Sequence, residues 1–298
     1  MGGRCHRVGD MENPYGTDRA VLDPRIFNEL TAPLDLGMVN LKPTSGSTNT
    51  ELAQLASTGE AGHLSVYYTE HQQAGKGRLG REWVTPAGSS LTVSVLAVPG
   101  PGFPPESLSW YTMLAALAWS RAAENTCGVP LGIKWPNDLL AGEQKVCGIL
   151  AQMVPVGNGY GVVVGTGINV NQSREELPVA TATSLRLAGA KNLNRTELLA
   201  EYLKQFAALD RGFRQVGGMA QMPLPASNGK SLHQLVSAKL ATLGHDVRVE
   251  FPDGSTLVGT AIELGTDGSL VLEHGTGQRE HVLAGDVHHV RRADGKYA

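Results

Sequence analysis

Residues 75–81 read Gly-Lys-Gly-Arg-Leu-Gly-Arg, and the segments that flank this heptad restrict the fold more than any other feature of the chain. Both flanks, His63–Thr69 and Leu91–Leu96, are rich in residues that favour β-strands. A dinucleotide-binding Gly-x-Gly-x-x-Gly loop must be followed directly by a helix, and none begins here, so a Rossmann fold is excluded. Lys76 is followed by glycine instead of Ser or Thr, which excludes a Walker A loop. The heptad therefore predicts a glycine-rich loop between two strands.

The composition of the heptad indicates an anion-binding loop. Glycine lets the backbone approach a ligand closely. Lys76, Arg78 and Arg81 supply positive charge for phosphate or carboxylate groups. A kinase-type glycine loop also lies between strands, but the sequence has no His-Arg-Asp or Asp-Phe-Gly motif to accompany it. Two interpretations stay open at this point: a clamp for a multiply anionic small molecule, or an exposed, solvated turn.

The overall composition excludes several classes of protein. A formal charge of −3 over 298 residues argues against general nucleic-acid binding, which favours a basic surface. No apolar run reaches the length of a membrane span, and Met1–Ala20 lacks the apolar segment of a secretory signal. Cys5, Cys127 and Cys147 contain no Cys-x-x-Cys pair, which favours a reducing compartment. We therefore expect a cytoplasmic protein that contacts no membrane.

The order of predicted elements indicates an α+β fold with three parts. Residues 1–40 are rich in Gly and Pro, with one short helix at Pro24–Leu30, and we expect a loose extension too short for a DNA-binding domain. Residues 41–230 mix helices and strands without strict alternation, which predicts the main α+β domain. Residues 231–298 contain short strands with Gly-rich turns, typical of a small β-barrel. Helices are expected from Ser47 or Thr48 onward, over Glu106–Glu124 and over Arg195–Phe213, and a weak linker over Gly217–Lys230.

A second chemical signal is the segment Lys134-Trp135-Pro136-Asn137-Asp138. A strand should deliver Lys134, and Pro136 should end it in a stiff corner. Lysine suits phosphate oxygens, and Asp138 can hold a magnesium ion that itself binds phosphate. The alternative is an ordinary Asn-Asp turn.

Two further glycine-containing strands complete the set. In Lys145–Leu150, Gly148 leaves room for a ligand against the backbone, although edge lysines and strand glycines are common. In Gly165–Asn171, two glycines at i and i+2 share one face and offer a flat platform for a ring-bearing ligand. A β-bulge is the structural alternative.

Taken in order, these segments resemble the motifs of the biotin protein ligases. The resemblance covers about Lys42 to Phe213, and the C-terminal strands look like the small SH3-like domain of that family. It implies a mixed-sheet catalytic domain like that of class II synthetases. The matching residues are Ser47-Thr48-Asn49, Gln73, the heptad, Trp83, Lys134–Asp138, Lys145–Leu150, Gly165–Asn171 and Ala182-Thr183-Ser184-Leu185.

The resemblance implies an activity in two steps. The family activates biotin with ATP and Mg²⁺ to biotinyl-5′-AMP and transfers biotin to one lysine of the biotin carboxyl carrier domain of an acyl-CoA carboxylase. No protein nucleophile is needed, and catalysis would be positioning plus electrostatics. The heptad would close over the adenylate and exclude water. For this chain the family implies a monomer or weak homodimer that does not bind DNA.

The resemblance also implies roles for particular residues. Arg78, Lys145 and Asp138 would be catalytic, with Asp138 also on the metal. Biotin would contact Ser47, Thr48, Asn49, Gln73, Gly75, Arg78, Lys145, Gly148, Gly165 and Gly167. ATP or the adenylate would contact Lys76, Arg78, Arg81, Trp83, Lys134, Asn137, Asp138, Asn169 and Arg291.

Two departures and three alternatives accompany this interpretation. Lys76 stands where the family usually has arginine, and Cys147 stands where alanine or glycine is common, which would tighten the pocket floor. A lipoate ligase shares the fold but normally lacks such a heptad. A non-catalytic biotin-binding regulator would bind without forming AMP. A DNA-binding repressor is disfavoured by the short N-terminal extension.

Overall fold

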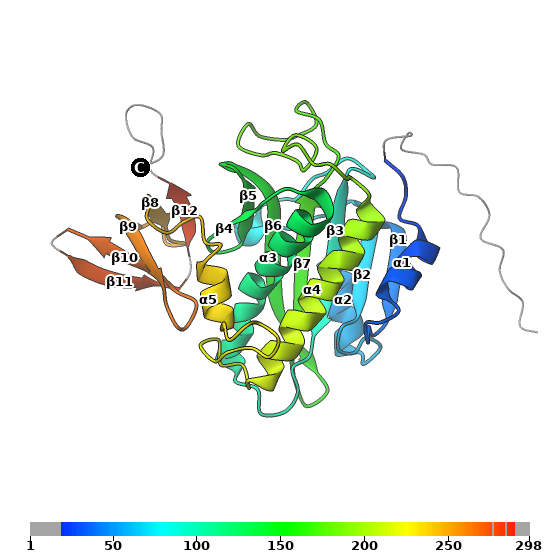
Figure 1. Cartoon of the computed structure of the whole chain (residues 1–298), viewed down its shortest axis with the longest axis horizontal. Helices are drawn as coiled ribbons and strands as arrows, with labels where there is room; N and C mark the ends of the chain where they lie inside the picture. The colour runs from blue at the N-terminus through cyan, green and yellow to red at the C-terminus, as the bar shows by residue number, and fades with distance from the viewer. Residues whose placement is uncertain (1–18, 276, 284, 290–298) are drawn as a thin grey trace, which may run out of the picture.

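A seven-stranded mixed sheet forms the body of the computed structural model, which describes residues 19–275, 277–283 and 285–289 (Figure 1). The strand order is β1-β2-β3-β7-β6-β5-β4, and only β1 and β2 run parallel. Antiparallel neighbours linked by short turns, such as β6 and β7, need no crossover helix. The strands are β1 (Val39–Ser45), β2 (Val66–Gln72), β3 (Ser90–Ala97), β4 (Gly132–Lys134), β5 (Asp138–Ala141), β6 (Gln144–Val156) and β7 (Gly159–Asn169).

Two long helices cover one face of this sheet. α3 (Trp110–Ala122) and α4 (Arg195–Gln215) run side by side across it, with α1 (Pro24–Thr31) beside α4 (Figure 1). α3 is apolar around most of its circumference and is buried almost throughout. Trp119 of α3 stacks on Tyr202 of α4 with ring centroids 4.0 Å apart. The aromatic residues that the sequence placed in this helix therefore belong to the core.

A single short helix covers part of the opposite face. α2 (Thr48–Ser57) packs against β2, β3, β6 and β7 through Leu52 and Ala56, both fully buried. Ser47 is its N-cap, which decides between Ser47 and Thr48, the two residues that the sequence offers for the start of this helix. The N-terminus of α2 consequently points over the middle of the sheet and leaves the surface next to it open.

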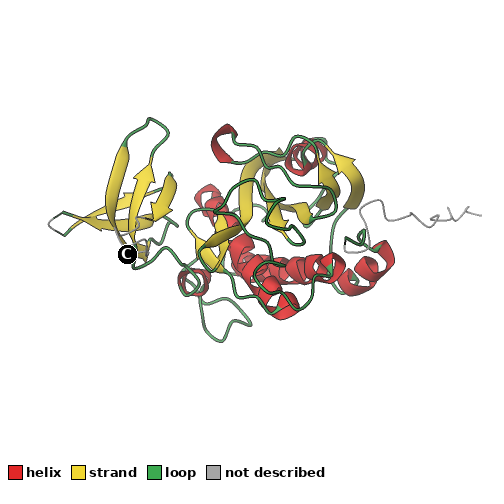
Figure 2. Cartoon of the chain, turned by 90° about the horizontal axis from the view of Figure 1, so that it is seen from above, coloured by secondary structure: helices red, strands yellow, loops and turns green. Residues whose placement is uncertain are grey.

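The C-terminal strands form a second sheet at one end of the molecule (Figure 2). It is antiparallel, in the order β11-β10-β9-β8-β12, and its connection to the first sheet runs through α5 (Leu232–Ser237). The two sheets are joined where Ala241 N–H donates to Ile133 O at 2.7 Å and Trp135 Nε1–H donates to Gly268 O at 3.0 Å. These strands are β8 (Asp246–Glu250), β9 (Thr256–Leu264), β10 (Leu270–His274), β11 (Gln278–Val282) and β12 (Asp286–His289).

The predicted α+β class, with a mixed sheet and a C-terminal β-domain, is confirmed. The predicted helix over Glu106–Glu124 is regular α-helix only over Trp110–Ala122, because Pro104 and Pro105 start a 3₁₀ turn before it and a π-turn follows it. None of the helices in the described part of the chain is long and apolar enough to cross a membrane.

The described part of the N-terminal extension is not loose, contrary to the sequence prediction. Asp23 caps α1, and Phe27 is fully buried. Leu22 N–H donates to Glu70 Oε1 at 2.8 Å, and Glu70 also forms a buried ion pair of 2.7 Å with Arg195. Residues 1–18, including Cys5, lie outside the described residues.

Candidate functional site

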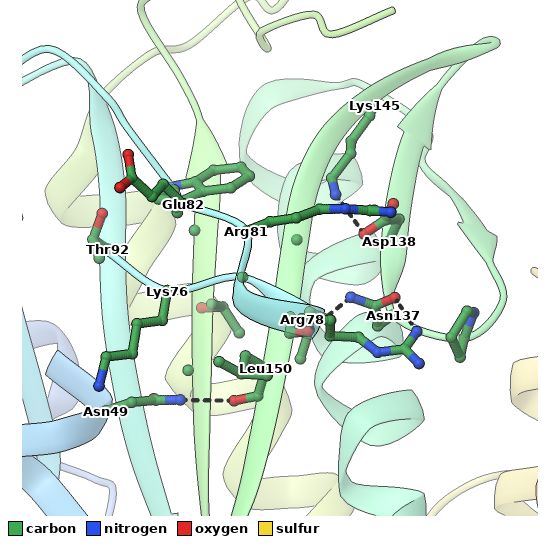
Figure 3. Close-up of a pocket in the computed structure, with 18 of the residues that line it drawn as sticks. Asn49, Lys76, Arg78, Arg81, Glu82, Thr92, Asn137, Asp138, Lys145 and Leu150 are labelled. Carbon is green, nitrogen blue, oxygen red and sulfur yellow. Dashed lines mark hydrogen bonds and ion pairs between the residues drawn. The ribbon is translucent and has the colours of Figure 1, made fainter. Parts of the chain in front are cut away.

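A pocket of about 190 Å³ lies on the open side of the sheet, beside the N-terminus of α2 (Figure 3). The heptad covers it from one side, and the corner between β4 and β5 closes it from the other. The structure brings together most of the site residues predicted from the sequence. Those that line the pocket are Ser47, Thr48, Asn49, Lys76, Arg78, Arg81, Trp83, Lys134, Asn137, Asp138, Lys145, Gly148, Gly165 and Gly167.

One end of the pocket is built from uncharged polar groups at the start of α2. Thr48 N–H donates to Gln72 Oε1 at 3.0 Å, and the Thr48 hydroxyl lies 3.3 Å from the same oxygen. The Ser94 hydroxyl donates to Asn49 Oδ1 at 2.6 Å. All four side chains are buried. Thr48 and Gln72 line the pocket, and donors and acceptors of this kind suit a compact polar ring.

Gln72 is a site residue that the sequence prediction missed in favour of Gln73. Gln73 is exposed and does not line the pocket, whereas Gln72 is buried and does. Successive side chains of a strand point to opposite faces, so at the end of β2 only one of the two glutamines can face the pocket. The structure moves this assignment from Gln73 to Gln72. The alternation of side chains along β2 could have identified Gln72. Two adjacent glutamines made that choice ambiguous in the sequence.

The glycine platform on β7 carries protein side chains. A Cβ atom on Gly165 would lie 2.0 Å from Asn49 Oδ1, and one on Gly167 would lie 2.4 Å from Trp83 Nε1. Asn49 Nδ2–H also donates to Leu150 O at 2.9 Å, so both ends of its amide are used within the protein (Figure 3). The two glycines therefore seat Asn49 and Trp83 against the sheet, and all four residues line the pocket.

The other end of the pocket is charged. Lys145 of β6 forms an ion pair of 2.7 Å with Asp138 at the start of β5 (Figure 3). Its Nζ lies 5.9 Å from the centre of the Trp83 ring. Burial lowers the pKa of Lys134, although the carboxylate of Asp138 opposes that shift. This end offers cations to an anionic ligand, and Asp138 keeps them from repelling one another.

The heptad forms a tight turn between strands, as predicted. Gly77 N–H donates to Arg81 O at 2.6 Å, Arg81 N–H to Arg78 O at 3.1 Å and Trp83 N–H to Gly75 O at 2.9 Å. Leu79 has φ 54° and is 59% exposed, so its side chain is held out in solvent. Gly75, a predicted biotin contact, is buried and does not line the pocket, and a Cβ atom on it would lie 2.2 Å from the carbonyl oxygen of Trp83.

The arginines of the heptad already have partners. Arg78 Nη1–H donates to Asn137 Oδ1 at 3.1 Å (Figure 3) and to Gly285 O at 3.3 Å. Arg81 forms an ion pair with Asp286 of β12. Lys76 points along α2, with its Nζ 3.4 Å from Thr50 Oγ1.

Three further predictions have different outcomes. Asn169 does not line the pocket, because its amide donates to Thr183 O at 2.9 Å and accepts from Gln172 at 3.0 Å. Cys147 is fully buried and does not form the pocket floor, since Gly148 beside it faces the pocket and Cys147 faces the helices. Burial raises the pKa of the Cys147 thiol, so it is unsuited to be a nucleophile. Arg291 lies outside the described residues.

Two family models and solved structures resemble this chain. Residues 42–169 match the Biotin/lipoate A/B protein ligase family, and residues 242–290 match the Biotin protein ligase C terminal domain. The fold resembles that of a biotin protein ligase from Aquifex aeolicus, solved with biotin and ATP, with a TM-score of 0.67 and 24% identity over 84% of this chain and 97% of that one. The fold and the pocket thus define a protein of the biotin and lipoate ligase class.

Curated relatives narrow the class. The biotin--[acetyl-CoA-carboxylase] ligase of Mycobacterium tuberculosis (strain ATCC 25618 / H37Rv) is 35% identical over 83% of this chain and 87% of its own. The bifunctional ligase/repressor BirA of Escherichia coli (strain K12) is 30% identical over 63% of this chain and 58% of its own. The chain belongs to the biotin protein ligase family.

Proposed function

We propose that this protein is a biotin–[biotin carboxyl-carrier protein] ligase. It would use ATP to form biotinyl-5′-AMP and transfer biotin to a lysine of the biotin carboxyl carrier domain of an acyl-CoA carboxylase. The observation that carries the proposal is a single pocket with an uncharged polar end at α2 and a cationic end at Lys145 and Arg78. Biotin has this polarity, with a polar ureido ring at one end and a carboxylate at the other.

The first step joins two anions, and the charged end of the pocket supports it. A carboxylate oxygen of biotin attacks the α-phosphorus of ATP, the bond to the bridging oxygen breaks, and pyrophosphate leaves. Arg78, Lys134 and Lys145 would offset the repulsion between the reactants. In the second step the lysine amine of the carrier attacks the acyl carbon, loses a proton, and releases AMP.

The uncharged end would hold biotin in place. Thr48, Gln72 and Ser47 would meet the ureido ring, whose donors and acceptors are costly to bury without partners. Trp83 would pack on the adenylate from its seat on Gly167. The remaining assignments are Asn137 and Arg81 for ATP, Lys76 at the mouth, Gly148 for close backbone approach, and Asn49 as the support of the wall.

Asp138 fits a magnesium ion that arrives with ATP. Among the described residues, no group of three His, Cys, Asp or Glu side chains is arranged to hold a metal. Magnesium is commonly held by one or two carboxylates together with substrate phosphates, and Asp138 lines the pocket next to Lys145. When bound, Mg²⁺ would supply positive charge to the phosphate oxygens.

We also propose the wider setting of this activity. Residues 41–230 would form the catalytic domain, with residues 1–40 as an N-terminal extension and residues 231–298 as an SH3-like C-terminal domain. The protein would work in the cytoplasm as a monomer or weak homodimer, without DNA or a membrane. A formal charge of −3 supports the absence of DNA binding.

Biotin-dependent exchange of labelled pyrophosphate into ATP tests the proposal. We expect exchange with biotin, no exchange without it, and no competition from lipoate at equal concentration. Labelled biotin should then appear on an isolated carrier domain, and on none in which the acceptor lysine is replaced by Arg. Exchange with lipoate alone would indicate a lipoate ligase. Biotin binding without exchange would indicate a non-catalytic regulator.

A further inference from the structure

Asp286 lies outside the main sheet yet contacts the anion-binding heptad. It is the first residue of β12 in the C-terminal sheet, and its side chain is 14% exposed. Its carboxylate forms an ion pair with Arg81, and Oδ1 lies 3.9 Å from Arg78 Nη1. The preceding residue, Gly285, accepts a hydrogen bond of 3.3 Å from the same Arg78 nitrogen. Asp286 and the residue just before β12 therefore hold both arginines of the heptad.

The heptad needs an outside partner to keep its arginines in place. Three glycines among its seven residues weaken local order, and Lys76, Arg78 and Arg81 repel one another. Within the turn itself only short backbone hydrogen bonds oppose this repulsion. Asp286 supplies the opposite charge, and because a strand of the C-terminal sheet carries it, that charge has a fixed position.

The contact also directs Arg78 toward the pocket. The Arg81 side chain is 64% exposed and forms its ion pair with Asp286 at the protein surface. Arg78 is only 23% exposed and lies between Asn137 Oδ1 and Gly285 O. The guanidinium has five N–H donors, and two hydrogen bonds are formed by a single nitrogen, so several donors are left for an anion.

We infer that Asp286 is a positioning residue: through Arg81 and Arg78 it fixes the heptad over the pocket and couples the C-terminal sheet to the adenylation site. The inference rests on the proposed function for its kinetic consequence, but the coupling itself concerns the ligand-free protein. Loss of the Asp286 charge leaves Arg81 without its partner and loosens the turn. The loosened turn then binds ATP more weakly and retains the adenylate for a shorter time.

Amide hydrogen exchange in the ligand-free protein tests the coupling directly. The reporters are the hydrogen-bonded amides of Gly77, Arg81 and Trp83. Asp286→Asn should raise their exchange rates about tenfold, within the range expected for a contacting charge pair. Arg81→Gln should do the same, and the double variant should add little to either, because both remove one interaction. Asp286→Glu should restore most of the protection.

Glu250→Gln is the matched control. Glu250 pairs with Asp286 across the β8–β12 ladder, and Glu250→Gln removes the same charge as Asp286→Asn. The ion-pair partners of Glu250, however, are Arg248 and His288. Glu250→Gln should leave the three reporter amides unchanged. If Asp286→Asn and Arg81→Gln also leave them unchanged, Asp286 does not position the heptad, and the inference is wrong. If Asp286→Asn fails to fold, Arg81→Gln still tests the same ion pair, because the Arg81 side chain is exposed and its replacement should not disturb folding.

Two kinetic measurements then ask whether the coupling matters for adenylation. Asp286→Asn should raise KM for ATP and speed the release of biotinyl-5′-AMP, each about tenfold, and Asp286→Glu should reverse both changes. A loss in kcat alone, with KM and release unaltered, would contradict a positioning role. If the wild-type protein shows no biotin-dependent exchange, the proposed function fails, while the exchange rates of the reporter amides still decide the coupling.

Discussion

At the scale of single residues, adjacent positions in this chain have opposite roles because a strand alternates its faces. Gln72 points into the pocket and accepts from Thr48, while Gln73 points to solvent. On β6, Gly148 faces the pocket and Cys147 faces the helices. If the alternation along a strand is assigned one residue out of step, the pocket-facing and the opposite-facing residues are exchanged.

The glutamine pair provides the first prediction. Gln72→Ala removes the acceptor of Thr48 N–H and leaves a buried donor unpaired, which costs about 1–3 kcal/mol. Because the ureido ring of biotin would lose its proposed partner as well, biotin affinity should fall roughly ten- to a hundredfold, measured by isothermal titration calorimetry. Gln73→Ala, at an exposed position, serves as the control and should change affinity less than about twofold. The reverse ranking of the two variants would place Gln73 on the ligand.

Asp138 provides the second prediction. Only adenylation handles the triphosphate and its magnesium, so Asp138→Asn should slow adenylation about ten- to a hundredfold, as expected for a charged hydrogen bond of about 1.5–3 kcal/mol. Transfer from preformed biotinyl-5′-AMP should change far less. Rapid-quench measurement of each half-reaction checks this.

The control for Asp138 is Asp246→Asn. Asp246 is an exposed carboxylate that accepts from Thr260 at 2.7 Å on β9, away from the pocket, and its loss should affect neither step. Equal losses in both steps for Asp138→Asn would show that Asp138 mainly holds the corner after Pro136 and orients Lys145.

At the scale of elements, β7 shows how glycines shape a site by making room for side chains from other elements. Gly165 and Gly167 lie on one face of the strand, and each gives its space to a side chain from another element. Asn49 comes from α2, and Trp83 follows the heptad. The glycines thus let a helix and a loop close onto the sheet at the pocket.

Gly165→Ala provides the third prediction. The added Cβ would lie 2.0 Å from Asn49 Oδ1, so Asn49 must move and give up its bond to Leu150 O or Ser94. Overpacking of this kind costs about 1–3 kcal/mol in the free energy of unfolding. Urea denaturation measures the loss, and biotin affinity should decrease with it.

Gly159→Ala on the same strand is the matched control. Its added Cβ would meet only Val156 O, at 3.9 Å, which is an ordinary contact. The free energy of unfolding should then stay within about 0.5 kcal/mol of the wild type. Equal effects at Gly165 and Gly159 would mean that the cost comes from strand propensity and not from Asn49.

At the scale of the whole molecule, one buried carboxylate joins the two long helices to the loops next to β2 and β3. Asp210 of α4 accepts from the Tyr111 hydroxyl of α3 at 2.7 Å and from Arg214 Nε at 2.9 Å. His63 Nε2 lies 3.2 Å from Oδ2, the oxygen that accepts from Arg214, and His63 Nδ1 accepts from Val98 N–H at 3.0 Å. An imidazole that accepts at Nδ1 carries a proton on Nε2, the atom that faces Asp210.

The Asp210 cluster gives the fourth prediction, which concerns pH. Burial by itself would raise the pKa of Asp210, but the His63 contact, the Tyr111 hydroxyl and Arg214 outweigh it, and the pKa is lowered. The unfolded chain therefore binds this proton more readily than the native state. The stabilisation is present at neutral pH and is lost as the pH falls below about 4, through the lowered folded-state value.

Asp210→Asn should remove that part of the acid dependence. At pH 7 it should lower the free energy of unfolding by about 3 kcal/mol, typical of breaking a buried charged network. Urea titrations at several pH values, compared with the wild type, measure both effects. Asp35→Asn is a matched control, since this carboxylate is exposed on the surface and is not part of the cluster. Parallel pH curves for Asp210→Asn and wild type would contradict the assignment.

Much of the architecture follows from the sequence alone, because short-range chemistry decides it. Alternation and β-branched residues mark the strands on both sides of the heptad, apolar periodicity marks α3 and α4, and Ser47 marks the start of α2. The cationic heptad and the Lys134–Asp138 corner each suggested anion binding, but an ordinary turn stayed open for both, and only the resemblance to the biotin protein ligases joined them and Lys145 into one site.

Only the tertiary structure decided how these pieces meet. Strand phase selected Gln72, the close approach of α2 and Trp83 filled the glycine platform, and the docking of β12 brought Asp286 to Arg81. Arg81 and Asp286 are 205 positions apart in the chain. Local propensity carries no information about a contact between residues so distant, because it forms only when two separately folded sheets pack side by side.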